Sequence, residues 1–429
     1  MGNKDIVILG AGPAGISAGY HLKQQGIEAV LYEKKDDFGG LCGSFSVGDY
    51  RFDHFAHMTF SKKTEVNALL EEQTPYLVHT PEAWNYDRGR WVRNPVQNNL
   101  VGLDVEDRIR VIESFLERPK NLEPENYKDW LQKSYGDYFA ENFPARYTRK
   151  YWTVEPDALE PEWVKGRMYV PKLAEVLRGA MTEDTPNVHY SKEMHYPKSG
   201  GFREFLEPLA KGLDIRYGKE AEQINFAQKR IMFADGTGAE YETLISTLPL
   251  AGLPELVKDL PEDVSEAAGE LDYTSGYMVS VGLKRKIEFP SVWFYIYDED
   301  ILPARVYLSD KKSPDNAPGG CSALQAEVYV SKYRRLELPM EALKEQVVGQ
   351  LLTLGLFERE DIAVTDIRFE RYANIMFTPK IYGARAMVRA YLEKQGVATA
   401  GRFGEWDYLW LEQSLLSGKR AAKEVLGKK

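Results

Sequence analysis

The sequence predicts an α/β fold that begins with a strand–turn–helix–strand unit, and three observations at the N-terminus lead to this prediction. A β-branched run, Asp5–Leu9, passes directly into the glycine turn Gly10–Gly15. A helical stretch then opens at Ile16, and a second apolar run, Ala29–Tyr32, ends at Glu33. A glycine pattern alone is weak evidence, but this order of elements is typical of a dinucleotide-binding βαβ unit.

The glycines of the turn have separate physical tasks. Gly10 permits the tight turn out of the strand, Gly12 lets the backbone approach a pyrophosphate, and Gly15 lets the helix lie close on the sheet. The helix N-terminus offers unpaired N–H groups and a partial positive charge to phosphates. Glu33 follows about twenty residues after the first glycine, where a carboxylate accepts hydrogen bonds from ribose hydroxyls.

Composition sets limits on the class of protein. The 429 residues are enough for two or three domains, and a net charge of −10 argues against nucleic-acid or anionic-membrane binding. Cys42 and Cys321 are the only cysteines, too few for a disulfide framework or a zinc cluster. The glycine turn interrupts the apolar N-terminus and no apolar run reaches bilayer length, so we expect a cytoplasmic protein.

The middle of the chain predicts two further regions. Residues 63–195 read as a mainly helical domain, with helices over Glu65–Glu72, Val105–Glu117, Tyr127–Leu131 and Leu173–Met181. A glycine-marked turn and a helix through Leu209 follow. Alternating runs around Asp235–Gly238 then predict a small antiparallel meander of three strands: Glu220–Asn225, Arg230–Phe233 and Thr243–Thr247.

Residues 276–394 read as an antiparallel β-sheet substrate domain with one helix, Met340–Leu354. Its predicted strands are Tyr277–Leu283, Val292–Tyr297, Ala304–Leu308, Ala323–Val330 and Ile367–Arg371.

The C-terminal segment repeats the strand-to-helix pattern of the N-terminus. A strand over Val397–Gly401 precedes a helix over Leu411–Leu426 that is rich in small residues. The amides of such a turn could reach a flavin, and the alternative is an ordinary amphipathic terminal helix. Taken with the first turn, the pattern favours FAD bound by a discontinuous, Rossmann-like domain of the glutathione-reductase type, made of residues 1–62, 196–275 and 395–429.

The residues expected to contact FAD come from the first and the last of these three segments. They are Gly10, Gly12, Ala14, Gly15, Glu33, Lys34, Gly39, Gly40, Leu41, Gly401, Arg402, Gln413 and Ser414.

Three residues are candidates for chemistry. His57 follows the double glycine Gly39-Gly40 and in a flavin fold would pass close to the isoalloxazine ring; the alternative is a hydrogen-bonded core histidine. Arg167 and Arg305 have the forked geometry that suits a diphosphate, whereas most arginines are solvated surface charges. The residues alone leave both alternatives open.

Several segments taken together resemble the UDP-galactopyranose mutases, especially their eukaryotic-type branch, and bacterial amine-oxidase-like flavin proteins. The specific pieces are Pro95-Val96-Gln97-Asn98-Asn99 and Gly401-Arg402-Phe403-Gly404-Glu405-Trp406. They are accompanied by Gly10–Gly15, Gly39-Gly40, His57–Ser61, Tyr151–Val154 and Gly166-Arg167.

The resemblance implies an isomerase that uses reduced FAD without net redox change. In this family the flavin N5 attacks the anomeric carbon of a nucleotide sugar, and the sugar recloses in the other ring size. By resemblance, His57 and Phe60 lie beside the flavin, and Arg167 and Arg305 hold the diphosphate. Tyr295 and Tyr408 donate hydroxyls to it, and Gln97 and Trp152 lie on the nucleotide side. NAD(P)H is a candidate reductant.

The chain also departs from the family pattern. Asn94 and Val96 replace an aromatic pair, Thr148 and Glu412 replace asparagines, and Lys312 and Met376 replace tyrosines. By resemblance these positions contact the nucleotide and the diphosphate, so the flavin chemistry is better supported than UDP-galactose as the substrate. Two other readings stay open: an FAD oxidoreductase of the amine-oxidase or protoporphyrinogen-oxidase type, and a flavin protein that has lost catalysis.

Overall fold

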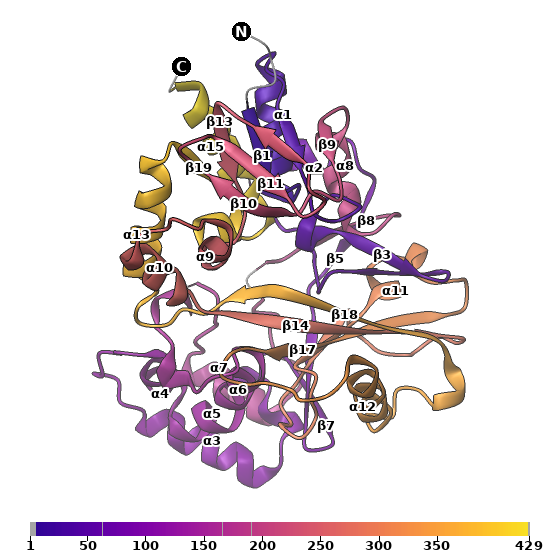
Figure 1. Ribbon diagram of the computed structural model, residues 1–429. Coiled ribbons are helices and arrows are strands. Elements are labelled where there is room, and N and C mark those ends of the chain that lie inside the picture. Colours follow the sequence, from indigo (N-terminus) through magenta and orange to yellow (C-terminus); the bar gives the residue numbers. More distant parts are fainter. Residues whose placement is uncertain (1–5, 62, 165, 190, 428–429) are drawn as a thin grey trace.

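The computed structural model describes residues 6–61, 63–164, 166–189 and 191–427. It is a mixed α/β structure in which a parallel sheet with its helices forms the upper part of Figure 1. A long antiparallel sheet crosses the middle, and a group of helices lies below it. Asp5, the first residue of the predicted N-terminal strand, lies outside the described residues.

The parallel sheet joins strands from distant parts of the chain. Its order is β19 (Val397–Thr399), β13 (Thr243–Ser246), β1 (Ile6–Leu9), β2 (Val30–Tyr32) and β9 (Asp214–Arg216). Both faces of β1 are buried: Ile6 and Ile8 pack in one apolar cluster, and Val7 and Leu9 pack in another. Burial on both sides explains why this strand is a continuous apolar run.

One strand was assigned to the wrong sheet from the sequence. The expected meander exists as β10 (Ala221–Asn225), β11 (Arg230–Phe233) and β12 (Gly238–Glu240), but Thr243–Ser246 is not part of it. This segment pairs in parallel with β1 and β19 instead. The prediction failed because a short apolar run does not reveal the direction of its partner.

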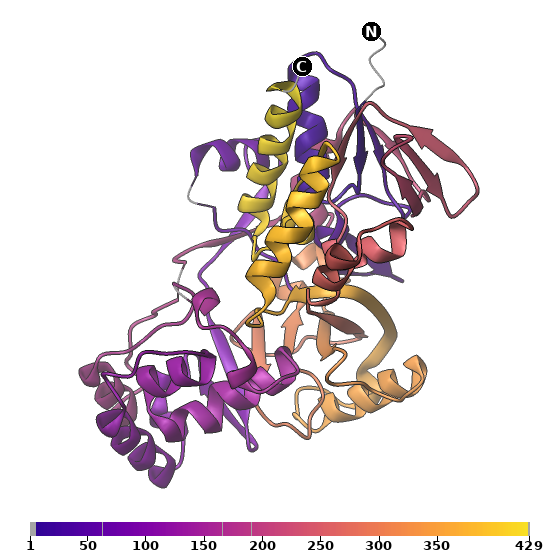
Figure 2. The same cartoon turned by 60° about the vertical axis from the view of Figure 1, so that its left-hand side comes forward.

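Helices α1 (Pro13–Gln24) and α15 (Leu411–Gly427) lie side by side on one face of the parallel sheet (Figure 2). Their close approach depends on Gly418, because a Cβ there would lie 2.1 Å from the Ala14 carbonyl oxygen. The other face carries the meander, α10 (Glu262–Gly269) and α13 (Ile381–Lys394). Helix α13 was not predicted from the sequence.

The second large sheet has seven strands. Its order is β18 (Ile362–Ile375), β14 (Tyr273–Leu283), β17 (Ser322–Val330), β16 (Arg305–Leu308), β15 (Trp293–Ile296), β6 (Ala83–Asp87) and β7 (Arg90–Arg93). The pairs are antiparallel except for β15 with β6. Helix α12 (Met340–Leu352) packs on this sheet. Residues 63–195, expected to be mainly helical, thus contribute two strands to the predicted substrate domain.

The remaining elements complete the molecule. The helices are α2 (Thr64–Leu70), α3 (Val105–Glu117), α4 (Tyr127–Tyr135), α5 (Asp137–Ala140), α6 (Arg146–Tyr151), α7 (Leu173–Met181), α8 (Glu207–Ala210), α9 (Leu253–Leu256), α11 (Ser309–Lys312) and α14 (Gly401–Glu405). Two antiparallel two-stranded sheets complete the strands: β3 (Ser44–Val47) and β4 (Tyr50–Asp53) form a hairpin, and β5 (Tyr76–His79) pairs with the distant β8 (Met194–Pro197). Within the described ranges, the helices are all too short or too polar to cross a bilayer.

Candidate active site

A cavity of about 1420 Å³ is lined by residues of the parallel sheet's turns, the seven-stranded sheet and the helical region. Of the site residues predicted from sequence, all but Gly15 and Gly39 line it. They are Gly10, Gly12, Ala14, Glu33, Lys34, Gly40, Leu41, His57, Phe60, Gln97, Trp152, Arg167, Tyr295, Arg305, Gly401, Arg402, Tyr408, Gln413 and Ser414. Side chains separated by hundreds of residues thus share one wall.

The N-terminal glycine turn has the form that a pyrophosphate requires. Gly10 has φ 95°, and Gly12 lies so close to Gly40 that a Cβ on Gly40 would be 3.2 Å from the Gly12 Cα. Gly15 shapes the turn from behind, since a Cβ there would lie 2.0 Å from the Gly10 carbonyl oxygen. Gly39 likewise acts through its backbone, which has φ 108° and donates to the Ala11 carbonyl at 2.8 Å.

Glu33 holds the turn that the cofactor would occupy. Its Oε2 accepts a hydrogen bond from the Ala11 N–H at 2.8 Å, and its Oε1 accepts one from the Lys35 N–H at 3.0 Å. The carboxylate is buried but belongs to the cavity wall, so it is placed where a ribose could reach it. A buried carboxylate anchored on backbone donors is a rigid acceptor.

The second glycine turn brings another helix N-terminus to the same cavity. Gly401 has φ 85°, and its N–H donates to the Ser417 hydroxyl of α15 at 2.8 Å. Gln413 and Ser414, in the first turn of α15, line the cavity. With α1 and α15 both opening here, two helix N-termini offer their partial positive charge to one elongated anionic cofactor. The cavity therefore fits FAD.

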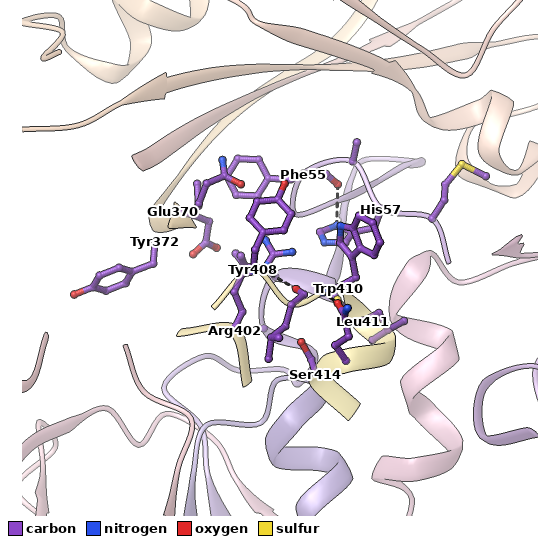
Figure 3. A pocket seen from close by; sticks show the side chains of 18 of the residues that line it. Phe55, His57, Glu370, Tyr372, Arg402, Tyr408, Trp410, Leu411 and Ser414 are labelled. Carbon is purple, nitrogen blue, oxygen red and sulfur yellow. Dashed lines mark hydrogen bonds between the residues drawn. The ribbon is translucent and has the colours of Figure 1, made fainter. Parts of the chain in front are cut away.

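His57 lies in the cavity wall, on a tightly constrained turn (Figure 3). Its Nδ1 is 3.3 Å from the carbonyl oxygen of Phe55, a non-glycine residue with φ 67°. The imidazole stacks on Phe202 with ring centroids 5.2 Å apart. Burial lowers the pKa of His57 to about 3, so the side chain is neutral at physiological pH.

The two candidate arginines are held in different ways. The Arg167 guanidinium lies 4.0 Å from the ring centroid of Tyr408 and 4.5 Å from that of Trp410, and it donates to the Tyr408 carbonyl at 3.2 Å. Arg305 instead pairs with buried Glu327 through Nε at 2.8 Å and Nη2 at 2.7 Å. Both guanidiniums are therefore oriented before any ligand binds.

The candidates for substrate contacts are mostly aromatic. Phe60 packs edge-on against Trp410 with ring centroids 4.8 Å apart, and Trp152 lies 6.4 Å from Tyr408. The Tyr295 hydroxyl accepts a hydrogen bond from the Trp293 indole at 3.1 Å. Gln97 Nε2 donates to the Tyr169 carbonyl at 2.9 Å. The wall therefore combines aromatic faces with polar groups held in fixed positions, a composition that suits a small-molecule site.

The structure corrects the expectation for several departures from the family pattern. Met376 is fully buried in the apolar cluster that contains Trp152 and lies outside the cavity wall, and the same holds for Val96. Lys312 lines the cavity but is not a free point charge, because its ammonium pairs with buried Asp53. Glu412 accepts a hydrogen bond from the Ser61 hydroxyl at 2.6 Å.

Sequence reasoning missed several residues of the site. Asp53 and Glu327 are buried carboxylates that hold Lys312 and Arg305, respectively. Glu370 lines the cavity; although burial opposes its ionisation, the His54 imidazole 3.1 Å away and the charge of Lys35 lower its pKa to about 2. Asp53 could have been suspected from the sequence, because it lies four residues before His57. Glu327 and Glu370 lie in segments whose sequence predicts strands but gives no indication of a site.

Comparison with known proteins gives the family. A family model described as flavin-containing amine oxidoreductase matches residues 13–426. Among curated proteins, the thiamine thiazole synthase of Sulfolobus acidocaldarius is 49% identical over 39 residues, 9% of this chain and 15% of that protein. The probable flavin-containing monoamine oxidase A of Dictyostelium discoideum is 43% identical over 49 residues, 11% of either chain. The matches span less than a fifth of these relatives.

Solved structures match over the whole chain. A crystal structure of reduced UDP-galactopyranose mutase superposes with a TM-score of 0.91 at 26% identity, covering 99% of this chain and 96% of that one. A putative protoporphyrinogen oxidase from Exiguobacterium sp. 255-15 (TM-score 0.76, 16% identity, 100% of both chains) shares the fold. So does a putrescine oxidase double mutant (0.67, 14%, 99% of both).

These findings confirm the resemblance to the UDP-galactopyranose mutases that the sequence motifs indicated, and they place it within a wider group of flavoenzymes. The cavity, with its two glycine turns and two helix N-termini, has features that suit a flavin dinucleotide. The chain belongs to the flavin-containing amine oxidoreductase family, and its cofactor is FAD.

Proposed function

We propose that the protein is an FAD-dependent nucleotide-sugar mutase that interconverts pyranose and furanose forms. The observation that carries the proposal is the placement of Arg167 and Arg305 on the cavity that the two glycine turns also line. The full-length likeness to reduced UDP-galactopyranose mutase supports it. In this proposal residues 1–62, 196–275 and 395–429 form the discontinuous FAD-binding domain.

Reduced FAD, when bound, supplies a nucleophilic nitrogen, N5, that can attack the anomeric carbon of a sugar. The chain's own task is to hold the nucleotide sugar and to stabilise the diphosphate as it leaves and returns. Two guanidinium groups suit this task, because each presents a planar fork to phosphate oxygens and stays charged at every relevant pH. The Tyr295 and Tyr408 hydroxyls add uncharged donors on the same wall.

The aromatic wall has a second role in this proposal. Phe60, Tyr408 and Trp410 exclude water from the place where the sugar would lie, and Trp152 packs beside Tyr408 towards the nucleotide side. Water exclusion protects a reactive sugar from hydrolysis and strengthens the attraction between the arginines and the diphosphate. His57 is neutral, so it offers this region a hydrogen-bonding group without adding charge.

An FAD oxidoreductase of the amine-oxidase or protoporphyrinogen-oxidase type is the second candidate. The family model and two solved structures of the same fold favour it. Two oriented arginines would repel a cationic amine, however, and Arg305 lies in the cavity wall with a buried carboxylate behind it. The charge arrangement therefore favours a diphosphate-bearing substrate.

The test uses the FAD-loaded protein under anaerobic conditions. The flavin is reduced with dithionite, or in parallel arms with NADPH or NADH, and a panel of nucleotide sugars is followed by chromatography. We expect a furanose product only with reduced flavin. Failure with every sugar, together with oxygen consumption on an amine or a porphyrinogen, would replace the mutase by the oxidase.

The diphosphate role of Arg305 is tested separately. Arg305→Ala should weaken UDP binding by about tenfold or more, since a charge-assisted fork contributes about 1.5–3 kcal/mol. The visible spectrum of bound FAD should persist. Arg285→Ala is a matched control, because Arg285 is half-exposed and pairs with Asp361 away from the cavity. Equal UDP affinity in both variants would remove Arg305 from the substrate site.

A further inference from the structure

Glu327 is a buried carboxylate that lies between the arginine of the proposed diphosphate site and the turn that carries His57. It is 0% exposed and stands opposite Arg305 in the pairing of β17 with β16. Oε2 accepts from Arg305 Nε at 2.8 Å and from the Tyr329 hydroxyl at 2.6 Å, and it lies 2.7 Å from Arg305 Nη2 in an ion pair. Oε1 accepts from the Ala56 N–H at 2.7 Å.

The two oxygens of Glu327 thus face different parts of the site. One contacts a guanidinium that lines the cavity, and the other contacts the backbone immediately before His57. Arg305 keeps donors for a ligand: its side chain is 20% exposed, and its Nη1 makes no hydrogen bond to any residue that the structure describes. An anion can therefore bind Arg305 without first breaking the pair with Glu327.

The turn depends on contacts of this kind. Phe55 has φ 67°, a left-handed conformation that is unfavourable in a non-glycine residue and persists only when neighbours hold it. The Phe55 ring stacks on Tyr329 with centroids 5.9 Å apart, and the Tyr329 hydroxyl donates to Glu327. Glu327 therefore holds the turn both through the Ala56 N–H and through Tyr329.

We propose that Glu327 is a positioning residue that couples the binding of an anion at Arg305 to the geometry of the turn carrying His57. The inference rests on the proposed function, because the anion is the diphosphate of a nucleotide sugar. When a diphosphate shares the guanidinium, Glu327 is less fully neutralised and becomes a stronger acceptor for the Ala56 N–H. Occupation of the substrate site then tightens the turn beside the flavin.

The experiment measures hydrogen exchange at the Ala56 amide in FAD-loaded protein, with and without saturating UDP or inorganic pyrophosphate. Calorimetry on the same samples gives the binding of each probe. We expect exchange at Ala56 to slow by about threefold or more with either probe, since a charge-assisted hydrogen bond is roughly twice as strong as a neutral one. No change at Ala56 despite measured binding would overturn the inference.

Two variants of Glu327 distinguish the effect of its charge from the effect of its side-chain length. Glu327→Gln removes the charge, and Glu327→Asp keeps the charge on Arg305 but is too short to reach the Ala56 N–H as well. Both should still bind UDP, and both should lose the slowing at Ala56. If Glu327→Gln does not retain FAD, the test relies on Glu327→Asp. The inference is overturned if UDP or pyrophosphate slows exchange at Ala56 as much in a variant that retains FAD as in the unaltered protein.

Asp87→Asn is the matched control. Asp87 is also a buried carboxylate in the seven-stranded sheet, paired with Arg146 at 2.6 Å, but it does not line the cavity. In Asp87→Asn, UDP or pyrophosphate should still slow hydrogen exchange at the Ala56 amide. If this slowing were lost, the effect of the Glu327 variants would reflect a general loosening of the sheet, and the inference would be overturned. If neither UDP nor pyrophosphate binds the unaltered protein, the proposed function fails and the inference fails with it; binding without coupling overturns the inference alone.

Discussion

At the scale of single residues, the buried pair of Lys312 and Asp53 is a place where one substitution should cost much stability. Their side chains are 1% and 0% exposed, and Asp53 also accepts hydrogen bonds from Ser44, Tyr196 and the Phe202 N–H. Burial opposes the ionisation of Asp53, yet the charge and hydrogen bonds of its partners leave its pKa below the usual value. The carboxylate is therefore charged and needs its cation.

Lys312→Met should lower the free energy of unfolding by about 3–5 kcal/mol, because it leaves Asp53 buried without a counter-charge. The loss should be greatest at neutral pH and shrink under acid conditions, where Asp53 takes up a proton. Chemical denaturation at several pH values measures it. Lys229→Met, which breaks the exposed pair with Glu242, should change stability little. Equal effects of the two variants would contradict this account.

His57 gives a prediction about pH. Its pKa in the folded protein is about 3, lowered by burial, whereas a histidine in the unfolded chain has its ordinary value near 6.5. The contribution of His57 to stability is therefore complete above about pH 6.5 and is lost as the pH falls towards 3, since only the unfolded state then gains a proton. His57→Gln should make the acid loss of stability shallower.

Histidine NMR of the FAD-loaded protein checks the same point directly. The signals that disappear in His57→Gln should not titrate between pH 5 and 8. His189, which lies in another part of the cavity wall and whose pKa burial also lowers, provides an internal comparison. A titration of His57 near pH 6.5 would show that the imidazole is solvated.

Residues in contiguous motifs were predictable from the sequence, and residues paired across strands were not. The roles of Gly10, Glu33 and Gly401 can be predicted because each residue stands at a fixed place in a local pattern of strand, turn and helix. Glu327 acquires its role from the register of β16 and β17, which sets it opposite Arg305, and Asp53 from a partner 259 positions away. Register and long-range pairing depend on the whole fold, so a single sequence does not reveal them.

At the scale of elements, the contact between α1 and α15 positions both helix N-termini at the cavity. Gly418→Ala should separate the two helices, because its Cβ would lie 2.1 Å from the Ala14 carbonyl oxygen and 2.9 Å from the Ser17 Cβ. We expect FAD affinity to fall by about tenfold or more and stability by about 1–3 kcal/mol. Gly349→Ala, in α12, is the control, since nothing lies within 4 Å of its Cβ and alanine favours helix. Weaker FAD binding in both variants would point to a different cause.

Regular apolar spacing predicted some elements to the residue, but other elements with a visible pattern were not predicted. Helices α3 and α7 have the predicted bounds, because their apolar positions repeat with helical spacing. The β6–β7 hairpin was missed although Asp87–Arg90 is a turn signal between aromatic-rich runs. Helix α13 was missed although Ile381, Ala384, Val388 and Leu392 form one buried face.

At the scale of the whole molecule, the cavity is the place where the distant parts of the chain meet. Its wall includes residues of the glycine turns. It also includes Arg305 and Tyr329 of the seven-stranded sheet, and Tyr147 and Trp152 of the helical region. In the proposed function FAD lies along the glycine turns and the nucleotide sugar occupies the rest of this wall, so the cofactor borders the other parts of the chain. FAD should therefore stabilise the molecule as a unit and not only the domain that carries the glycine turns.

FAD binding should accordingly raise the free energy of unfolding of the apoprotein by about 2.7 kcal/mol when free FAD is a hundredfold above its dissociation constant. Tryptophan fluorescence reports mainly the helical region and the seven-stranded sheet, and far-UV circular dichroism reports all elements. Both should show the same shift of the denaturation midpoint with FAD. FMN is the matched control: it lacks the adenosine half that Glu33 and the Gly10–Gly15 turn are placed to hold, so at equal concentration it should stabilise less. If FAD shifts the circular-dichroism transition and leaves the tryptophan transition where it was, then the cofactor holds only its own domain, and the cavity does not link the parts of the chain energetically.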